Sequence, residues 1–324
     1  MSKVILGIDG GGTKTHAVLV DLGGNIIASA ANGGANWERT GIAATQISLM
    51  EIVDRVLESA GMTSKDIVSA TFALAGIDWE SDKELFNPTA NALGLSNNTS
   101  FINDSIAALF AGSSSGIGCV SIAGTGGKTS GRNSTETFQT MGMDLGEGGG
   151  AGQLVSLALD YVARIHHGIE CPSKLSQLVL QETGFTDETL FFKAVAREGL
   201  KLSEDLAPKI FDLASEGDVG SISIVNTVAS QHANDVSAMI NKIGLSGNQV
   251  QVIRAGGLHT AGCNTFDETF EKALKSKHSG ATTQILDISP VYGAVVHAAH
   301  QHFGEAPAEF LDNLFAQARI KGDL

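Results

Sequence analysis

The chain has 324 residues, of which 43% are hydrophobic and only 6% aromatic, with 39 glycines and a formal net charge of -14 at pH 7. This length allows one large or two medium domains, and a glycine-rich, aromatic-poor core favours an α/β protein over a sandwich or a helix bundle. An acidic chain without a basic block excludes nucleic acid and anionic membrane surfaces as partners, whereas a nucleotide held by backbone amides and Mg²⁺ stays compatible.

The chain opens with three predicted strands, at 3–9, 16–22 and 25–30, which are joined by tight glycine-containing turns. Strands linked this closely must be antiparallel. Apolar residues at helical spacing then predict a helix over 41–62, which ends at a normal C-cap glycine, Gly61.

A buried strand is predicted at 67–77, followed by a helical stretch over 81–95 that Pro88 interrupts. A short strand at 99–104 leads into a helix over 105–112. Three antiparallel strands followed by alternating helices and strands make one complete α/β unit.

The second half repeats this opening, with a strand at 117–124, a glycine-rich turn over 124–134 and a further strand at 137–143. The long middle, 151–243, is helical in composition. The remaining predicted elements are strands at 251–257 and 282–288, a helix over 289–303 and an amphipathic surface helix over 305–324.

Two halves that each begin with a strand and a glycine-rich turn indicate two similar domains around a cleft. We place an N-terminal domain at 1–115, a C-terminal domain with a helical insertion at 116–303, and a helical tail at 304–324.

Two segments could be mistaken for membrane or export signals. Residues 105–127 carry no charge, but the glycine-rich middle of this stretch cannot stay helical in lipid, so we expect a helix, a loop, a strand and a loop. The apolar N-terminal run is interrupted by Asp9 and is too short for a signal peptide. We expect a cytoplasmic protein.

Two familiar phosphate motifs fail here. A P-loop would need a glycine where Ile122 stands, and no helical run follows Gly127-Lys128-Thr129. The dinucleotide fingerprint would need a glycine in place of Thr15, with a helix after it instead of a second strand. Neither loop is therefore predicted to bind phosphate through a helix N-terminus.

The remaining option is a hairpin turn whose backbone N–H groups face an anion. Its residues are Gly10, Gly11, Gly12, Thr13 and Lys14. Asp9, at the end of the first strand, could hold Mg²⁺, through water. The alternative is a tight hairpin without a ligand, but three consecutive glycines behind an aspartate favour a binding function.

The segment 7–24 resembles the first phosphate motif of the sugar kinase/actin/Hsp70 superfamily, and within it the chain resembles the BadF/BadG-type ATPase and N-acetylglucosamine kinase family. Further motifs follow in the family's order at 33–41, 73–82, 103–112, 123–127, 255–258 and 290–299. The resemblance implies two ribonuclease-H-like domains, ATP and Mg²⁺ as cofactors, a homodimer, and a nucleotide in the cleft between the domains.

The resemblance also implies roles for individual residues. Asp9 to Lys14 would form the first phosphate loop, and Gly124, Thr125 and Gly126 the second. Gly256 and Gly257 would lie against the adenosine. Lys128, beside the second loop, is most simply interpreted as solvated.

By the same resemblance, Asp104 is the base that accepts the proton of the attacking hydroxyl. The structural alternative is a helix N-cap, which is compatible with catalysis because a helix N-terminus stabilises an ionised carboxylate.

Sugar contacts are implied for Asn36, Gly76 and Asp78, where the alternatives are a loop turn for Asn36 and a helix cap for Asp78. Trp37 could stack on a sugar or be a buried aromatic residue.

The chain departs from the family at 146–150. Acetylglucosamine kinases typically carry Gly-Asp-Glu-Gly-Ser there, with an aspartate that contacts the sugar, whereas Glu147 stands in that place among glycines. The departure leaves the identity of the sugar open.

We interpret the chain as an ATP-dependent kinase of the 6-hydroxyl of N-acetylglucosamine or glucosamine. N-acetylmuramate, N-acetylmannosamine and glucose are alternative sugars. A different class is the ATPase that activates a partner enzyme through an iron–sulfur cluster, but the scattered Cys119, Cys171 and Cys263 contain no C-x-x-C and do not suggest cluster or zinc ligation. A sugar-responsive regulator would need a DNA-binding segment, and none precedes Lys3.

Overall fold

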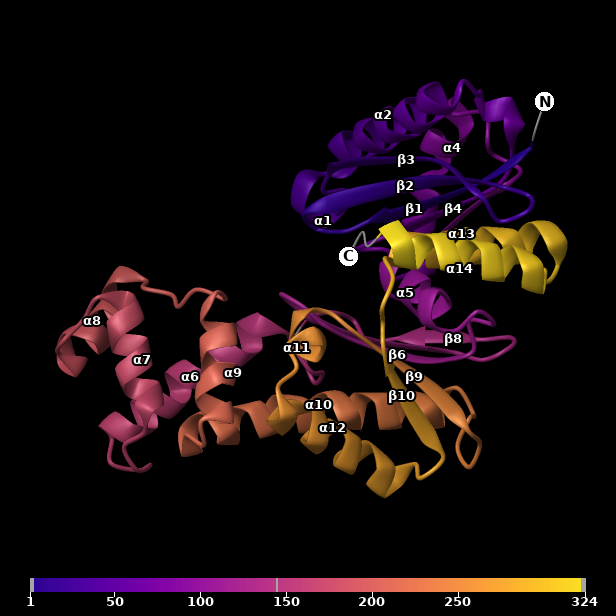
Figure 1. The fold of residues 1–324 in the computed structure, drawn as a ribbon. Coiled ribbons are helices and arrows are strands. Elements are labelled where there is room, and N and C mark those ends of the chain that lie inside the picture. Colours follow the sequence, from indigo (N-terminus) through magenta and orange to yellow (C-terminus); the bar gives the residue numbers. More distant parts are fainter. Residues whose placement is uncertain (1–2, 144, 322–324) are drawn as a thin grey trace. The chain divides into compact units, whose positions relative to one another are not determined.

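The computed structural model describes residues 3–143 and 145–321, and the chain forms two compact units (Figure 1). Unit 1 comprises residues up to Val120, a short segment at 131–137, and the chain from Leu286 onward. Unit 2 comprises 121–130 and 138–285. Our predicted boundaries placed 286–303 in the C-terminal domain, whereas this segment packs with the N-terminal strands.

Unit 1 is built on a five-stranded sheet with the order β3-β2-β1-β4-β5. Its strands are β1 (Val4–Gly10), β2 (Lys14–Asp21), β3 (Ile26–Gly33), β4 (Ile67–Leu74) and β5 (Thr99–Asn103). The first three pair antiparallel, as the tight turns predict, and β1, β4 and β5 run parallel. Because parallel strands end at one edge, the residues that follow β1, β4 and β5 share that edge of the sheet.

Helices cover both faces of this sheet (Figure 1). They are α1 (Trp37–Thr40), α2 (Ile42–Ala60), α3 (Glu80–Glu84), α4 (Asn87–Ala92), α5 (Asp104–Gly112), α13 (Pro290–Phe303) and α14 (Ala308–Lys321), with a 3-10 turn at Ser64–Asp66. The predicted helical stretch at 81–95 is two helices, and Pro88 lies in the first turn of the second, where its missing N–H costs nothing.

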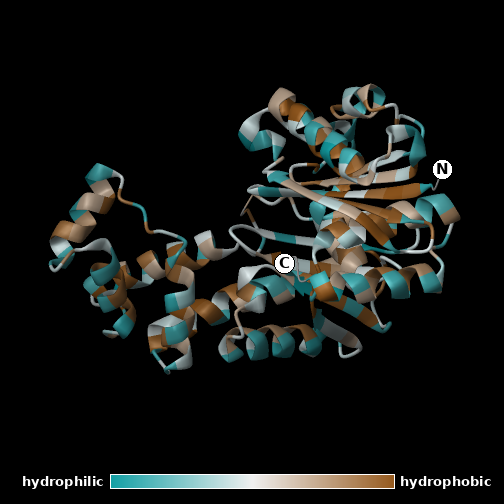
Figure 2. Ribbon diagram, turned by 45° about the horizontal axis from the view of Figure 1, so that its top comes forward, coloured by the Kyte–Doolittle hydropathy of each residue, from teal (hydrophilic) through white to brown (hydrophobic). Residues whose placement is uncertain are grey.

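The core of unit 1 lies between α2 and the sheet, whose strands are coloured mostly as hydrophobic in Figure 2. Leu49, Ile52, Val53 and Val56 of α2 are fully buried, and their spacing is that of one helix face. On the other side α13 approaches the backbone of β1 so closely that a Cβ on Gly7 would lie 2.5 Å from Val295 Cγ2. This close packing explains why 286–303 belongs to unit 1.

The sheet of unit 2 has the order β10-β9-β6-β7-β8. Its strands are β6 (Gly118–Ala123), β7 (Gly127–Arg132), β8 (Thr137–Gln139), β9 (Val250–Ala255) and β10 (Ala281–Ile285). Numbered from β6, this is the strand order of unit 1, which supports the duplicated plan inferred from the glycine-rich turns. The α/β fold class with two such sheets is confirmed.

One turn prediction and two strand predictions in this half need correction. The predicted turn over 124–134 contains β7, whose residues pair between β6 and β8 although Gly, Thr and Ser locally indicate a turn. The strands predicted at 137–143 and 282–288 are shorter, ending at Gln139 and Ile285. Sheet neighbours, which a local pattern does not contain, decide these limits.

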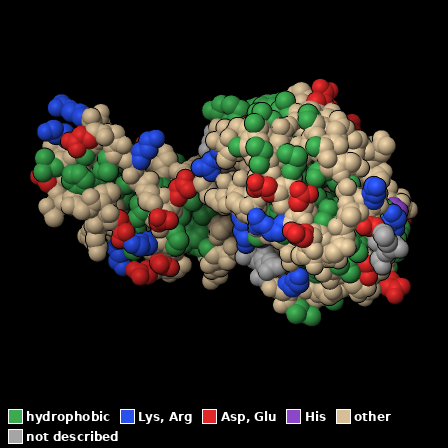
Figure 3. Space-filling view, turned by 90° about the horizontal axis from the view of Figure 1, so that it is seen from above, with side chains coloured by type: hydrophobic (Ala, Val, Ile, Leu, Met, Phe, Trp, Pro, Cys, Tyr) green, Lys and Arg blue, Asp and Glu red, His purple; other side chains and the backbone are tan. Residues whose placement is uncertain are grey.

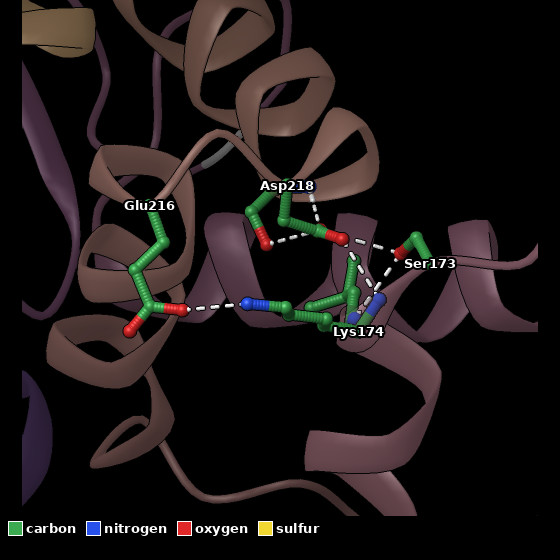
Figure 4. Close-up of polar contacts among 6 residues, drawn as sticks. Ser173, Lys174, Glu216 and Asp218 are labelled. Atoms are coloured by element: carbon green, nitrogen blue, oxygen red, sulfur yellow. Dashed lines mark hydrogen bonds and ion pairs between the residues drawn. The ribbon is translucent and has the colours of Figure 1, made fainter.

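The helical middle of unit 2 contains α6 (Ala151–His166), α7 (Lys174–Thr183), α8 (Glu188–Glu198), α9 (Leu206–Ser215) and α10 (Val219–Lys242), and α11 (Gly257–Thr260) and α12 (Asn264–Lys277) follow β9. Asp218 links two of these helices (Figure 4). Its carboxylate accepts from the Lys174 backbone N–H at 2.8 Å and from the Ser221 N–H at 2.9 Å, so it caps α7 and α10 together. Lys174 Nζ also pairs with Glu216 at 2.9 Å.

Residues 105–127 form most of α5, a loop, β6, the next loop and the first residue of β7, which agrees with the helix, loop, strand and loop that we expect from the sequence. Among the described residues, no helix combines the length and the apolar character needed to cross a bilayer. On the face shown in Figure 3, acidic and basic side chains are interspersed.

The C-terminal helix α14 packs on unit 1 through Phe310, Leu314 and Ala318, which are buried one turn apart, as the amphipathic pattern predicts. Its polar side chains bind the turn between β2 and β3: Gln317 Oε1 accepts from the Ile26 N–H at 3.1 Å, and Asn313 Nδ2 donates to the Gly23 carbonyl at 2.9 Å. Residues 322–324 of the predicted tail lie outside the described residues.

This contact yields a stability test. Gly24 has φ +86°, and a Cβ there would lie 2.2 Å from the Phe310 carbonyl oxygen. We expect Gly24→Ala to lower the free energy of unfolding by about 2–3 kcal/mol, through backbone strain and displacement of α14. Thermal unfolding measures the effect. Gly23→Ala is the control, because its Cβ would meet only side-chain atoms at 3.3 Å or more. Equal loss in both variants would contradict the assigned contact.

Candidate active site

The first predicted phosphate loop, residues 10–14, is the turn between β1 and β2. Gly11 donates its N–H to the Lys14 carbonyl at 2.9 Å, which closes the turn. The backbone N–H groups of Gly12 and Thr13 donate to no other residue of the described chain, and both residues are exposed. Two adjacent open amides at a glycine-rich turn form a concavity suited to an anion.

Neighbouring backbone holds this loop in place. Ala35 donates its N–H to the Gly11 carbonyl at 3.0 Å. A Cβ on Gly34 would lie 2.4 Å from the Gly12 carbonyl oxygen, and one on Gly10 would lie 2.7 Å from Leu74 Cδ2. The segment 33–36, which carries the predicted sugar residue Asn36, therefore packs directly on the phosphate loop.

Two carboxylates lie at this edge of the sheet: Asp9, near the end of β1, and Asp104, directly after β5. Burial, and to a smaller extent the negative charge of Asp104, raise the pKa of Asp9 to about 8. The Asp9 side chain is half-buried, near the end of a strand whose other residues are buried. An ionised Asp9 is thus costly without a cation, which is the environment that a divalent metal ion would relieve.

Asp104 is the first residue of α5, and the helix is capped by its neighbour. Asn103 Oδ1 accepts from the Ser105 N–H at 3.0 Å, so Asn103 takes the N-cap role that we considered for Asp104. Asp104 Oδ1 also accepts from the Ser105 N–H, at 2.9 Å. This position at a helix N-terminus favours the ionised carboxylate.

Asn103 also connects Asp104 to the loop after β4. Its Nδ2 donates to the Ile77 carbonyl at 3.0 Å and to Asp78 Oδ1 at 3.2 Å. The cap of α3 that we considered for Asp78 is made by Asp82, which accepts from the N–H groups of Asp78 and Trp79 at 2.9 and 2.8 Å.

Asn36 lies at the N-cap of α1, where its Oδ1 accepts from the Glu38 N–H at 2.9 Å. Trp37, which follows, is half-buried, and its Nε1 donates to the Gly76 carbonyl at 2.8 Å. The indole therefore joins the two predicted sugar-binding loops. Unit 1 in this way connects Asn36, Gly76, Asp78 and Asp104 with the phosphate loop, although their ligand contacts stay predictions.

The second predicted phosphate loop belongs to unit 2 and has the same character. Gly124 donates to the Gly126 carbonyl at 2.9 Å, while the N–H groups of Thr125 and Gly126 donate to no other described residue. A Cβ on Gly256 would lie 2.6 Å from the Ala123 carbonyl oxygen, so the predicted adenosine loop packs on the second phosphate loop.

A cavity of about 460 Å³ in unit 2 is lined by Gly124, Thr125 and Gly257, among others. The other wall of this cavity comes from the loop before α9 and from α9 itself, with Glu204, Asp205, Pro208 and Phe211. No motif marks these residues, because they reach the loop only through the packing of the helical insertion. The volume of this cavity is within the range typical of small-ligand pockets.

The glycine-rich segment 146–150 supports the second loop. A Cβ on Gly150 would lie 2.1 Å from the Gly124 carbonyl oxygen, and one on Gly127 would lie 1.7 Å from the Gly148 carbonyl oxygen. Ala151 donates its N–H to the Gly124 carbonyl at 2.8 Å. The backbones of 146–150 and 124–127 are in direct contact, with no room for a side chain between them. The glycines that depart from the family pattern therefore allow this contact.

Helix α10 holds this segment through three side chains. Gln231 Nε2 donates to the Glu147 carbonyl at 2.8 Å, and Asp235 Oδ2 accepts from the Gly148 N–H at 2.5 Å. His232, which is buried, bonds to the Gly149 carbonyl through Nε2 at 2.8 Å. Burial lowers the pKa of His232, so a neutral imidazole makes this bond.

Glu147 itself points into its own loop. Its carboxylate accepts from the N–H groups of Gly142 and Met143 at 3.0 and 2.6 Å. Burial raises its pKa, but bonds from Thr140 and these amides, together with the charge of Lys128, outweigh burial and hold the pKa below its ordinary value. Lys128 is half-buried, which corrects our interpretation of it as simply solvated.

Comparison with known proteins agrees with these motifs. Residues 6–298 match the BadF/BadG/BcrA/BcrD ATPase family. The chain is 28% identical over 267 residues to the N-acetyl-D-glucosamine kinase of Dictyostelium discoideum, covering 76% of this chain and 82% of the relative. It is 24% identical over 316 residues to the N-acetylmuramic acid/N-acetylglucosamine kinase of Clostridium acetobutylicum, covering 91% and 98%.

Among solved structures, a Chromobacterium violaceum protein assigned as an N-acetylglucosamine kinase has a TM-score of 0.65 to this chain at 18% sequence identity. The alignment covers 92% of this chain and 99% of that protein. At this level of identity the similarity establishes the fold.

The raised pKa of Asp9 predicts a pH effect on stability in metal-free, ligand-free protein. Its folded pKa of about 8 lies above the ordinary 3.8, so wild-type stability should fall as pH rises through that window. Asp9→Asn removes this loss. We expect the melting temperature of the variant, relative to wild type, to rise by several degrees between about pH 5 and about pH 8.5.

Thermal unfolding in EDTA measures this difference. Asp312→Asn, at an exposed position on α14, is the control and should show no such trend. A difference between Asp9→Asn and wild type that does not change with pH would overturn the assigned environment of Asp9.

Proposed function

Because the chain belongs to the BadF/BadG/BcrA/BcrD ATPase family, we propose that it is an ATP-dependent kinase that phosphorylates the 6-hydroxyl of an amino sugar, N-acetylglucosamine or glucosamine. The observation that carries this proposal is the connected cluster in unit 1, where an open-amide loop, Asp9, Asp104 and Asn36 share one edge of the sheet. The two amino-sugar kinases among the relatives support the choice of substrate class.

In this proposal, each unit contributes groups that bind the nucleotide. The N–H groups of Gly12 and Thr13 bind phosphate oxygens from unit 1, and those of Thr125 and Gly126 bind them from unit 2. The cavity of unit 2 receives the nucleoside next to Gly257. The carboxylates that line this cavity, Glu204 and Asp205, are suited to accept hydrogen bonds from ribose hydroxyls.

Asp9 fits the Mg²⁺ ion that such kinases require. It is half-buried beside a second carboxylate, and its raised pKa shows that its negative charge is poorly stabilised without a cation. Asp9 would hold the ion through water, and the bound ion would neutralise charge on the phosphates.

Asp104 acts as the base. Its carboxylate accepts the proton of the sugar hydroxyl as the hydroxyl oxygen bonds to the terminal phosphorus of ATP and the bond to the leaving ADP breaks. The N-terminus of α5 favours the ionised form of the carboxylate that accepts this proton. Asn103, which caps the helix and bonds Asp78, fixes the position of the carboxylate.

The sugar is bound by Asn36, Gly76 and Asp78 in this proposal. Asn36 uses its Oδ1 to cap α1, while its Nδ2 has no partner among the described residues and could donate to a sugar hydroxyl. A contact from Glu147 would require its carboxylate to give up the amides of Gly142 and Met143. We therefore expect Asn36 and Asp78 to contribute more than Glu147.

The alternative function, activation of a partner enzyme, finds less support. Cys119 is buried in β6, Cys263 is buried just before α12, and Cys171 is exposed. Burial raises the pKa of Cys119 to about 12, which disfavours a thiolate ligand.

A coupled ADP-release assay across glucosamine, N-acetylglucosamine, N-acetylmuramate, N-acetylmannosamine and glucose tests the proposal. We expect sugar-dependent turnover that is highest with an amino sugar, and product analysis should place the phosphate on the 6-oxygen. ADP release that no sugar accelerates would refute the kinase assignment.

The role of Asp104 is tested by Asp104→Asn, which keeps the shape of the side chain but cannot accept the proton. We expect kcat to fall by roughly 10²–10⁴-fold with little change in sugar affinity. Steady-state kinetics and sugar-binding calorimetry separate the two effects, and Asp312→Asn serves as a surface control. Turnover near the wild-type rate would remove Asp104 from the mechanism.

The second phosphate loop is tested by Gly150→Ala, whose Cβ would push against the carbonyls of residues 124–126. We expect ADP affinity to fall by about 10-fold or more, a cost of about 1.4 kcal/mol or more. Gly152→Ala is the matched control, since its Cβ would have ordinary contacts at 3.5 Å and beyond. Unchanged ADP binding by Gly150→Ala would show that this loop does not bind the nucleotide.

A further inference from the structure

Arg39 lies over the first phosphate loop, although no motif assigns it a role. It is the third residue of α1, its side chain is exposed, and its Nη1 lies 3.3 Å from the position that a Cβ on Gly12 would occupy. The absence of a side chain at Gly12 leaves the guanidinium next to the open amides of that turn.

The helix that carries Arg39 is fixed to the loop. Asn36 caps α1, and the Trp37 indole anchors it to the Gly76 carbonyl at 2.8 Å. The residues just before α1 pack on the loop itself, through the bond from Ala35 to the Gly11 carbonyl at 3.0 Å. The backbone that carries Arg39 is therefore packed on the phosphate loop within unit 1.

The described residues around Arg39 do not use its guanidinium in a structural interaction. No residue in the described ranges accepts a hydrogen bond or forms an ion pair with its guanidinium. The neighbouring Glu38 directs its carboxylate to the other loop, where Oε2 lies 3.2 Å from the Cβ position of Gly76. The planar donor fork of an unpaired arginine matches the geometry of phosphate oxygens.

The side from which Arg39 approaches indicates which phosphate it binds. It lies three residues after Asn36, on the segment that links the phosphate loop to the predicted sugar loops. The phosphate nearest the sugar is the one that is transferred. We infer that Arg39 binds the terminal phosphate of ATP and stabilises the charge on that group as it moves to the sugar, a role that rests on the kinase function proposed above.

Nucleotide pairs that differ only in the terminal phosphate test this inference. In Arg39→Gln we expect the affinity for the non-hydrolysable ATP analogue AMPPNP to fall by about 10-fold or more, with ADP affinity changed by less than about 3-fold. The kcat for sugar phosphorylation should fall by roughly 10²–10³-fold, since arginines on the transferred group contribute strongly in such reactions. Arg39→Lys should recover part of the loss.

Arg55→Gln is the matched control. Arg55 is also an exposed arginine near β3, but it donates to the Ala31 carbonyl at 2.9 Å and lies on α2, so nucleotide binding and kcat should be unchanged. Guanidinium ion added to Arg39→Ala should restore part of the activity if the missing group is the cation itself.

Two results would overturn the inference. Equal weakening of ADP and AMPPNP would show that Arg39 only supports the loop. Selective loss of turnover with N-acetylmuramate, but not with N-acetylglucosamine, would show that Arg39 binds a substrate carboxylate instead. If the wild type phosphorylates no sugar, the kinase proposal fails, while the ADP and AMPPNP comparison still decides whether Arg39 binds the terminal phosphate.

Discussion

Close contact between backbones at glycines holds both candidate phosphate loops, and the rest of the site depends on it. Gly34 lies against Gly12 in unit 1, and Gly150 lies against the carbonyls of 124–126 in unit 2. If side chains held such a loop, its backbone N–H groups would donate hydrogen bonds to them and would not be open to a ligand. Contact from backbone carbonyls and Cα atoms leaves the N–H groups at each turn open, and open amides on a rigid turn are what an anion requires.

The electrostatics of unit 1 divide the edge of the sheet into two parts. The carboxylates of Asp9 and Asp104 lie at the ends of the parallel strands β1 and β5, whereas the open amides and Arg39 lie at the exposed tip of the turn. Burying an ionisable carboxylate beside another costs stability, as the raised pKa of Asp9 records. Such a cost is typical of a site that gains its favourable energy only when ligand and cation are bound.

The glycine-rich segment of unit 2 shows how a departure from a family pattern can be absorbed by the fold. Where the family resemblance implies an acid that faces the sugar, Glu147 binds the amides of its own loop, and α10 holds the following glycines through Gln231, His232 and Asp235. The segment thereby supports the second phosphate loop. If the proposed kinase function holds, we expect sugar specificity to depend more on the loops of unit 1.

The sequence by itself determined the five strands and the two longest helices of the first half, the hairpin character of the first phosphate loop, and the position of Asp104 after a strand. Periodicity and glycine placement are local signals, and here the local preference agrees with the fold. Tertiary structure alone decided that β7 is a strand, that α13 returns to unit 1, and that Asn103 rather than Asp104 caps α5.

Tertiary structure also decided which residues outside the sequence motifs lie at the candidate site. Arg39 lies over Gly12, and Glu204 and Asp205 line the same cavity as Gly124. The physical reason is that these features depend on contacts between segments far apart in the chain, or on the direction of one side chain. Neither leaves a pattern in the residues next to it.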